Sequence, residues 1–228
     1  MSIYKPCDIR SDAAAQLSPE TYESWGRALG YRFPEGSKFV VGGDVRATTA
    51  GFRSALIGGL CAAGLDVVDL GEVTTSMVYH AERRLGAAGC AMVTASRRVS
   101  ELNGLKWMIG SRPPTPEEVE GLADTLQMRA AALPARNRTS PRSLDISFDY
   151  VAWFQESWVH ALLAEGFIIL DPMFGSCALR ARRYLQAIFP RCLVSAIHDQ
   201  PDPDRIGRCP DCSRSRLLEE LCDAVYRQ

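Results

Sequence analysis

The chain has 228 residues, a length that suits two modest domains, and its 26 basic and 27 acidic side chains leave a formal net charge of -1. This balance excludes a general electrostatic attraction to nucleic acid or to an anionic membrane, so any anion site must be local. No apolar run approaches the roughly 20 residues of a membrane-spanning helix, and residues 1–16 lack a secretion signal, so we expect a cytoplasmic protein.

The first part of the chain alternates predicted helices with short apolar strands. Ser18 followed by Pro19 is typical of a helix start, and this helix is expected to end at Gly30, a left-handed residue. Thr49 is expected to cap the next helix. Strands are predicted at 39–41, 67–70 and 90–94, and helices at 52–63 and 77–85. This alternation favours βαβ units in a layered α/β domain.

The pair Asn103-Gly104 is typical of a hairpin turn, so the strand predicted at 105–109 should run antiparallel to its predecessor in a mixed sheet. The stretch 115–118 has the capping-box pattern and opens a helix expected to reach about residue 132. Residues 133–141 are rich in Pro, Arg, Asn and Ser without periodicity, which is typical of a linker.

A second, smaller α/β unit is expected beyond the linker. Val151, Phe154, Trp158 and Leu162 recur at intervals of three and four, as in a helix packed on a core. Strands are predicted at 167–170 and 192–197, and helices at 178–188 and 217–225.

The cysteines and histidines indicate no metal centre. The cysteines lie mostly in apolar segments (Cys61, Cys90, Cys192, Cys222), as buried thiols do in reducing compartments, so no disulfide framework is expected. Cys209 and Cys212 have the spacing of half a zinc site, but no second pair follows. His80, His160 and His198 have no carboxylate or cysteine at ligand spacing, so we assign them no catalytic role.

The stretch from Val93 to Lys106, V-T-A-S-R-R-V-S-E-L-N-G-L-K, carries the strongest functional signal. It resembles the phosphoserine loop of the α-D-phosphohexomutases, the phosphoglucomutase and phosphomannomutase family, whose pattern is T-A-S-H-N-P followed by N-G-x-K. Arg97, Arg98 and Val99 stand where the family has histidine, asparagine and proline.

Further segments are similar to the family's in the same order along the chain. Residues 8–10 resemble its Y-D-I-R-G, residues 43–49 its G-R-D-x-R-x-S-S, residues 69–75 its D-x-G-x-x-x-T-P, and residues 170–175 its V-D-P-M-N-G. The resemblance implies domain I of the family over residues 1–135 and a shortened domain II over residues 143–228. The expected fold class is therefore α/β, with two layered α/β/α domains and mixed sheets.

The resemblance also implies roles for single residues. Ser96 would carry the phosphate, Lys106 would shuttle a proton near the reacting hydroxyl, and Arg10 and Arg46 would lie close to the active site. Asn103 is expected among the phosphate-binding residues. From the residues alone, Lys106 also fits a solvated lysine at a strand edge, and Arg46 a surface charge at a helix entrance.

Arg97 and Arg98 place two permanent cations beside Ser96. Guanidinium groups match tetrahedral oxyanions, so this pair is suited to a phosphosugar, a phosphate or a sulfate ion. A solvated loop explains the pair equally well. Both interpretations stay open.

The family binds magnesium through a D-G-D-G-D-R loop that does not occur in these 228 residues, so no cofactor and no metal ligand are expected in this chain. The resemblance implies an intramolecular phosphotransferase, an isomerase of carbohydrate metabolism. We expect it in truncated form, a pseudoenzyme unable to act as a mutase alone. The alternative is a binding or regulatory module that forms a homodimer or hetero-oligomer through surface exposed by domain loss. The sequence does not specify the sugar.

Overall fold

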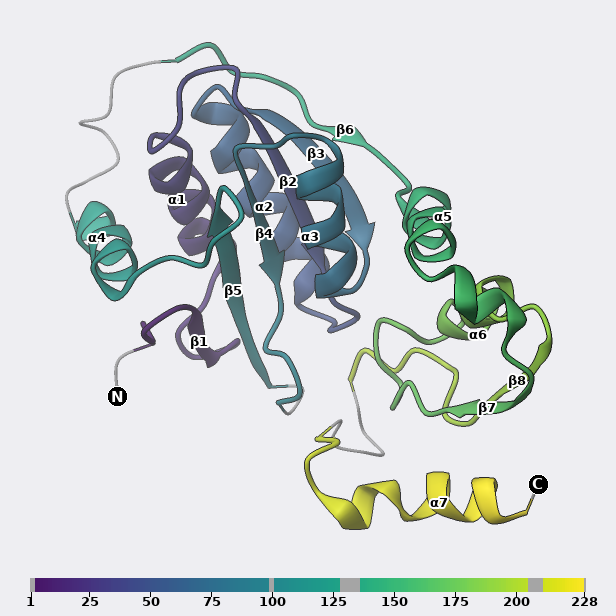
Figure 1. Cartoon of the computed structure of the whole chain (residues 1–228). Coiled ribbons are helices and arrows are strands. Elements are labelled where there is room, and N and C mark those ends of the chain that lie inside the picture. The colour runs from purple at the N-terminus through teal and green to yellow at the C-terminus, as the bar shows by residue number, and fades with distance from the viewer. Residues whose placement is uncertain (1–2, 99–100, 128–135, 205–210, 228) are drawn as a thin grey trace. The chain divides into compact units, whose positions relative to one another are not determined.

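The computed structural model describes residues 3–98, 101–127, 136–204 and 211–227. The chain divides into two compact units (Figure 1). Unit 1 consists of Met1–Ala95 and Glu101–Asp145, and unit 2 of Ser96–Ser100 and Ile146–Gln228. Each unit has its own sheet, and we describe each by itself.

Unit 1 is built on a six-stranded sheet with the strand order β1-β5-β4-β2-β3-β6. Strands β2 (Lys38–Gly43), β3 (Asp66–Glu72) and β4 (Gly89–Val93) are parallel, and the short strand β6 (Arg142–Ser143) extends them beside β3. Strand β5 (Leu102–Ile109) is antiparallel to β4, and β1 (Ile9–Asp12) is antiparallel to β5. The α/β class and the mixed sheet predicted for this unit are confirmed.

Helices cover both faces of this sheet (Figure 1). Helices α1 (Pro19–Gly30) and α2 (Thr49–Ala62) lie on one face, where Val41 and Val67 belong to their core, and α4 (Pro116–Gln127) packs beside α1. Helix α3 (Thr75–Arg84) lies on the other face, because a Cβ on Gly42 would be 2.6 Å from a methyl group of Val78. The alternation of side chains along each strand thus supplies two apolar layers.

The start of α1 agrees with the prediction, since Ser18 accepts a hydrogen bond from the Thr21 N–H and Pro19 occupies the first turn. The role predicted for Gly30 is wrong. Gly30 is the last residue of the helix, and a Cβ there would lie 2.4 Å from the Cβ of Ala63. The glycine therefore allows α1 and α2 to approach closely, rather than ending α1 in a left-handed conformation.

The predicted hairpin turn at Asn103-Gly104 is also wrong, because both residues lie inside β5. A Cβ on Gly104 would be 2.1 Å from the carbonyl oxygen of Ile9, so the glycine lets β1 run against β5. The antiparallel direction of β5 is nevertheless as predicted.

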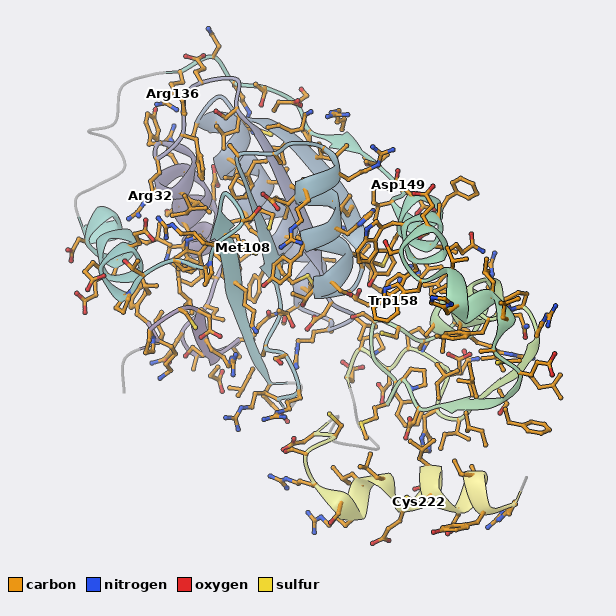
Figure 2. The ribbon with its side chains drawn as sticks, viewed as in Figure 1. Arg32, Met108, Arg136, Asp149, Trp158 and Cys222 are labelled. Atoms are coloured by element: carbon orange, nitrogen blue, oxygen red, sulfur yellow. The ribbon has the colours of Figure 1, made fainter. Side chains whose placement is uncertain are left out.

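The segment predicted as a linker, residues 133–141, begins with three residues outside the described part of the chain. From Arg136 onward it is tied to unit 1, because Nη1 of Arg136 donates to the carbonyl oxygens of Phe33 at 3.0 Å and Ala63 at 3.1 Å. Figure 2 labels Arg136. Unit 1 therefore reaches Asp145, ten residues past the end of the first domain expected from the sequence.

Unit 2 contains a pair of parallel strands, β7 (Gly166–Leu170) and β8 (Cys192–Ala196), with Phe167 opposite Leu193. Its described helices are α5 (Ser147–Ser157), η2 (Val159–Leu163), α6 (Ala181–Ile188), η3 (Ser215–Leu218) and α7 (Glu219–Tyr226). Each element predicted in this part of the chain is present, with bounds shifted by a few residues.

Unit 2 buries little of its apolar surface. No residue of α5 is fully buried. Trp158, labelled in Figure 2, is 61% exposed, whereas Val151, Phe154 and Leu162 are half-buried, so the stripe predicted to pack on a core does so only in part. The exposed large apolar side chains of the described residues all belong to unit 2: Phe148, Trp153, Trp158, Val159, Leu163, Phe167, Leu179, Leu193, Val225 and Tyr226. Unit 1 shows the opposite pattern, with a continuous buried core.

Two further expectations concern membrane helices and cysteines. None of the helices in the described ranges is long and apolar enough to cross a membrane. The described cysteines are free thiols, and Cys61, Cys90 and Cys192 are buried as expected, whereas Cys222 is exposed. Cys209, one of the two cysteines of the possible zinc pair, lies outside the described residues.

Candidate functional site

The carboxyl ends of β2 and β4 mark one edge of the unit 1 sheet as the candidate site. After β2 the chain passes through α2 to β3 on one side, and then returns through α3 to β4 on the other side of β2. Neighbouring strands whose connections leave in opposite directions are where ligand sites form in α/β sheets. Asp44 follows β2 directly and Thr94 follows β4 directly, so both stand at this point.

Asp44 is the centre of a buried network at this edge. Its Oδ1 accepts hydrogen bonds from the Thr49 hydroxyl at 2.7 Å and from the Arg46 N–H at 3.2 Å. Its Oδ2 accepts from the Thr94 hydroxyl at 2.7 Å and from Nε of Arg46 at 3.0 Å. One carboxylate thereby joins the end of β2, the start of α2 and the end of β4.

Arg46 is a buried member of the network. Its side chain is 0% exposed, and its Nη1 donates to the carbonyl oxygen of Leu102 at 3.0 Å. The interpretation of Arg46 as a surface charge is therefore wrong. A buried guanidinium paired with a carboxylate fixes its surroundings, and a direct catalytic role for Arg46 stays a prediction.

Asn103 joins the same network from β5. Its Nδ2 donates to the hydroxyls of Thr48 at 2.8 Å and Thr49 at 3.0 Å, and its Oδ1 accepts from the Gly104 N–H at 2.8 Å. Thr49 was expected to cap α2, but its hydroxyl donates to Asp44, and the residue before the helix is Thr48. Asn103 thus holds the first turn of α2, and phosphate binding by it stays a prediction.

The network lies against a dry part of the core. The Tyr22 side chain is fully buried and its ring stacks on Phe52 at 4.5 Å between centroids. Burial raises the pKa of the Tyr22 phenol, and the nearby Asp44 carboxylate raises it further. Little water reaches this side of Asp44, which strengthens its hydrogen bonds.

Arg10 and Lys106 share one face of the sheet. Arg10 in β1 is opposite Gly104, and Lys106 follows two residues later in β5. Residues directly opposite, and residues two apart in a strand, point to the same face. Both side chains are partly exposed, and Nη2 of Arg10 donates to Asp8 at 2.7 Å. The structure thus brings these two cations to neighbouring strands.

Ser96 lies in the segment that joins β4 to β5. It has a φ of +59°, which is left-handed, and it is exposed together with Arg97 and Arg98. Within unit 2, Nε of Arg97 lies 3.4 Å from Oδ1 of Asp211, and the Arg97 side chain is 56% exposed. Arg97 therefore forms a solvated ion pair. Binding of a phosphate or sulfate ion by Arg97 and Arg98 stays a prediction.

Metal-binding groups and histidines were also assessed in the structure. Within the described ranges, no group of three or more His, Cys, Asp or Glu side chains is arranged to hold a metal ion. His198 does have carboxylate neighbours, contrary to the sequence analysis: its Nδ1 lies 3.0 Å from Asp171 and its Nε2 2.8 Å from Glu220. These partners are distant in sequence, so residue spacing could not reveal them.

Three residues of the network, Asp44, Thr49 and Thr94, were given no site role in the sequence analysis. The sequence does contain a signal for Asp44, because this acidic residue directly follows a buried apolar strand that ends in two glycines. A charged group at the carboxyl end of a parallel strand is a candidate for a site in an α/β sheet. The two threonines stand in the family-like segments 43–49 and 93–106, but their hydroxyls acquire this role only when folding brings them to Asp44.

Comparisons with known proteins agree with this architecture. The family model for phosphoglucomutase/phosphomannomutase, alpha/beta/alpha domain I, matches residues 2–129. A phosphomannomutase of Klebsiella pneumoniae is 34% identical over 156 residues, which are 66% of this chain and 98% of that protein. A phosphomannomutase of Escherichia coli is 34% identical over 156 residues, but only 34% of its length is covered.

A solved structure extends the likeness in fold to both units. The phosphoglucomutase/phosphomannomutase family protein of Burkholderia thailandensis matches 99% of this chain with a TM-score of 0.84 at 24% identity. The match covers 50% of that protein, so the chain spans about half of its length.

The mixed sheet, its helices on both faces and its switch point define a layered α/β protein. The chain belongs to the phosphoglucomutase/phosphomannomutase family of phosphohexomutases.

Proposed function

We propose that this chain takes part in phosphoryl transfer on hexose phosphates, with Ser96 as the residue that carries the phosphate. The observation that carries the proposal is the position of Ser96, an exposed residue three positions after the carboxyl end of β4, which is one of the two strands at the switch point. The phosphomannomutase relatives support hexose phosphates as the substrate class.

In the proposed step, a sugar hydroxyl attacks the phosphorus of phosphorylated Ser96. The new phosphorus–oxygen bond to the sugar forms while the bond from phosphorus to Ser96 Oγ breaks. The proton of the attacking hydroxyl passes by way of Lys106 Nζ to Ser96 Oγ, so atoms and charge balance. The reverse step, with a hexose 1,6-bisphosphate as donor, regenerates the phosphoserine. Arg10, on the face that carries Lys106, supplies positive charge near the transferred group.

The family resemblance implies magnesium, which when bound neutralises charge on a transferred phosphoryl group. The described residues offer no cluster that fits this ion, and the D-G-D-G-D-R motif is not among the 228 residues. We therefore propose that these residues alone do not interconvert hexose phosphates, and that polypeptide from outside them completes the site.

Intact-mass spectrometry tests the role of Ser96. The chain is incubated with magnesium and glucose 1,6-bisphosphate, with and without a polypeptide carrying the uncovered part of the E. coli phosphomannomutase. We expect the mass of one phosphoryl group on the wild type in the completed mixture and none on Ser96→Ala. No added phosphate under either condition, or phosphate retained by Ser96→Ala, would remove Ser96 as the carrier.

A second candidate function is a non-catalytic binding or regulatory module, and the apolar surface of unit 2 favours it. Phe167 is 62% exposed and Leu193 is 65% exposed, and they are opposite each other on β7 and β8, so they share one face. Large apolar patches on a folded surface mark interaction sites. We propose a homodimer or a hetero-oligomer that covers this face.

Light scattering tests the second candidate. The double variant Phe167→Ser, Leu193→Ser should lower the measured mass of the assembly, whereas Arg183→Ser, an exposed position on α6, should leave it unchanged. A wild type that stays monomeric at high concentration, with no partner recovered on immobilised chain, would contradict this candidate.

We propose the cytoplasm as the compartment. The buried free thiols Cys61, Cys90 and Cys192 support it, because reducing compartments preserve such groups. Recovery of the chain from a secreted fraction, rather than from the cytoplasmic one, would contradict the assignment.

A further inference from the structure

We propose that Asp44 is the positioning residue for Ser96, because its carboxylate, together with Arg46, fixes both ends of the loop that carries the serine. We call this loop the serine loop, and its described residues are Ala95–Arg98 and Glu101. The inference rests on the proposed function, since it assigns Asp44 a part in presenting the phosphate carrier. In this proposal Asp44 acts through its hydrogen-bond partners and not on the reacting atoms.

The first end of the serine loop is held through Thr94. The Thr94 hydroxyl donates to Oδ2 of Asp44 at 2.7 Å, and the Thr94 N–H donates to the carbonyl oxygen of Gly104 at 3.0 Å. The Asp44 N–H in turn donates to the carbonyl oxygen of Val93 at 3.0 Å. The backbone is therefore fixed up to the residue before Ala95, which is itself buried.

The second end is held through Arg46. Asp44 holds the Arg46 side chain through Nε, and Nη1 of the same guanidinium donates to the carbonyl oxygen of Leu102 at 3.0 Å. Leu102 is the first residue of β5, immediately after the serine loop. A single carboxylate thus acts on the two strands that the loop joins.

The position needs an anion. Asp44 accepts from two hydroxyls, one backbone N–H and one guanidinium N–H, all on its two oxygens. Its side chain is 6% exposed, so water could not replace a lost partner, and an amide would turn a donor toward Arg46. The charged carboxylate is the only side chain of this size that can accept all four hydrogen bonds.

Ser96 requires such support because its backbone is left-handed, with a φ of +59°. A non-glycine residue in this region is strained, and the strain persists only where the surroundings determine the backbone. The anchors at Thr94 and Leu102 fix the backbone on either side of the serine loop. When the Thr94 anchor is lost, we expect the loop to open and Ser96 to leave the left-handed region.

The test uses Thr94 rather than Asp44, since Asp44→Asn leaves a buried guanidinium without its anion and threatens the fold. Thr94→Val removes the hydroxyl at nearly constant volume, and Thr94→Ser keeps it. Val67→Ala is the control for a general loss of stability, because Val67 is a core residue of β3, a strand that pairs with neither β4 nor β5. Arg97 and Arg98 are trypsin sites inside the serine loop and report its opening.

We expect trypsin to cut after Arg97 or Arg98 on the order of tenfold faster in Thr94→Val than in the wild type, as for loss of one hydrogen bond to a charged group. Thr94→Ser and Val67→Ala should be cut there at the wild-type rate. Equal rates in Thr94→Val and Thr94→Ser would overturn the proposal, and so would an equal acceleration in Val67→Ala.

The rate of phosphate incorporation on Ser96 is the second measurement, made with glucose 1,6-bisphosphate in the completed mixture. Thr94→Val should be slower than the wild type, and Thr94→Ser should match it. Equal incorporation in Thr94→Val and the wild type would also overturn the proposal. If the wild type takes up no phosphate, the proposed function fails, and the trypsin rates then decide whether Asp44 fixes the loop.

Discussion

At the scale of single residues, Asp44 and Arg46 form a buried ion pair in unit 1. Both are buried, and together they contact β2, α2, β4 and β5. Removing one partner of a buried pair leaves an uncompensated charge in a medium of low dielectric constant, which is far more costly than the pair is stabilising.

Arg46→Met should therefore lower the free energy of unfolding by about 3–5 kcal/mol. Arg53→Met is the matched control, because Arg53 lies 3.1 Å from Asp69 without hydrogen-bond geometry and is 19% exposed. Partly solvated pairs contribute about 0–1 kcal/mol. Urea denaturation of both variants measures the difference, and a similar small loss in the two would contradict the part assigned to Arg46.

At the scale of elements, the contact between α1 and α2 depends on glycines. A Cβ on Gly59 would lie 2.0 Å from the carbonyl oxygen of Glu23, whereas a Cβ on its neighbour Gly58 would meet nothing within 4 Å. These two adjacent glycines of α2 thus differ in the atoms that an added side chain would meet.

We expect Gly58→Ala to stabilise unit 1 by about 0.5–1 kcal/mol, because alanine favours the helix. Gly59→Ala should destabilise it by about 1–3 kcal/mol, because the methyl group forces α1 and α2 apart. Thermal unfolding followed by circular dichroism measures both. Stabilisation by both substitutions would show that the two helices do not touch at Gly59.

The ion pair at the start of α4 predicts how the stability of the fold depends on pH. The Glu118 carboxylate accepts from both terminal nitrogens of Arg112 at 2.8 Å and from the Thr115 N–H at 2.8 Å. Arg112 first, and then this N–H, lower the pKa of Glu118 from 4.5 to about 2. A lowered carboxylate pKa adds stability above pH 4.5, and that stability is lost as the pH falls toward 2.

The stability difference between the wild type and Glu118→Gln should therefore shrink as the pH falls from 5 to 2, measured by urea unfolding at each pH. The effect should be small, since the Glu118 side chain is 24% exposed and solvent screens it. A difference that stays constant over this range would contradict the ion pair.

Much of the element order could be predicted from the sequence, because periodicity and capping residues report local structure. The capping box at Thr115 and the Ser18 cap are seen as predicted. Gly30 was wrongly predicted to end its helix in a left-handed conformation, and Gly104 was wrongly predicted to form a turn. Each glycine instead allows a distant segment to approach closely. The buried network could not be predicted for the same reason, because its hydrogen bonds join residues far apart in sequence.

At the scale of the whole molecule, the two units differ in how completely they are packed. Unit 1 holds a continuous apolar core, and the charged network at its sheet edge is satisfied internally. Unit 2 leaves large apolar side chains exposed on α5, β7, β8 and α7. In the chain, Ser96, the proposed phosphate carrier, directly follows the well-packed unit 1, and the exposed apolar side chains belong to unit 2.

The central claim is that Ser96 carries phosphate while these 228 residues alone do not interconvert hexose phosphates. Phosphorus NMR tests it most directly, by following glucose 1-phosphate with magnesium and a catalytic amount of glucose 1,6-bisphosphate in the presence of the purified chain. We predict no growth of the glucose 6-phosphate signal over many equivalents of chain. Sustained conversion by the wild type that is absent from Ser96→Ala would contradict the claim.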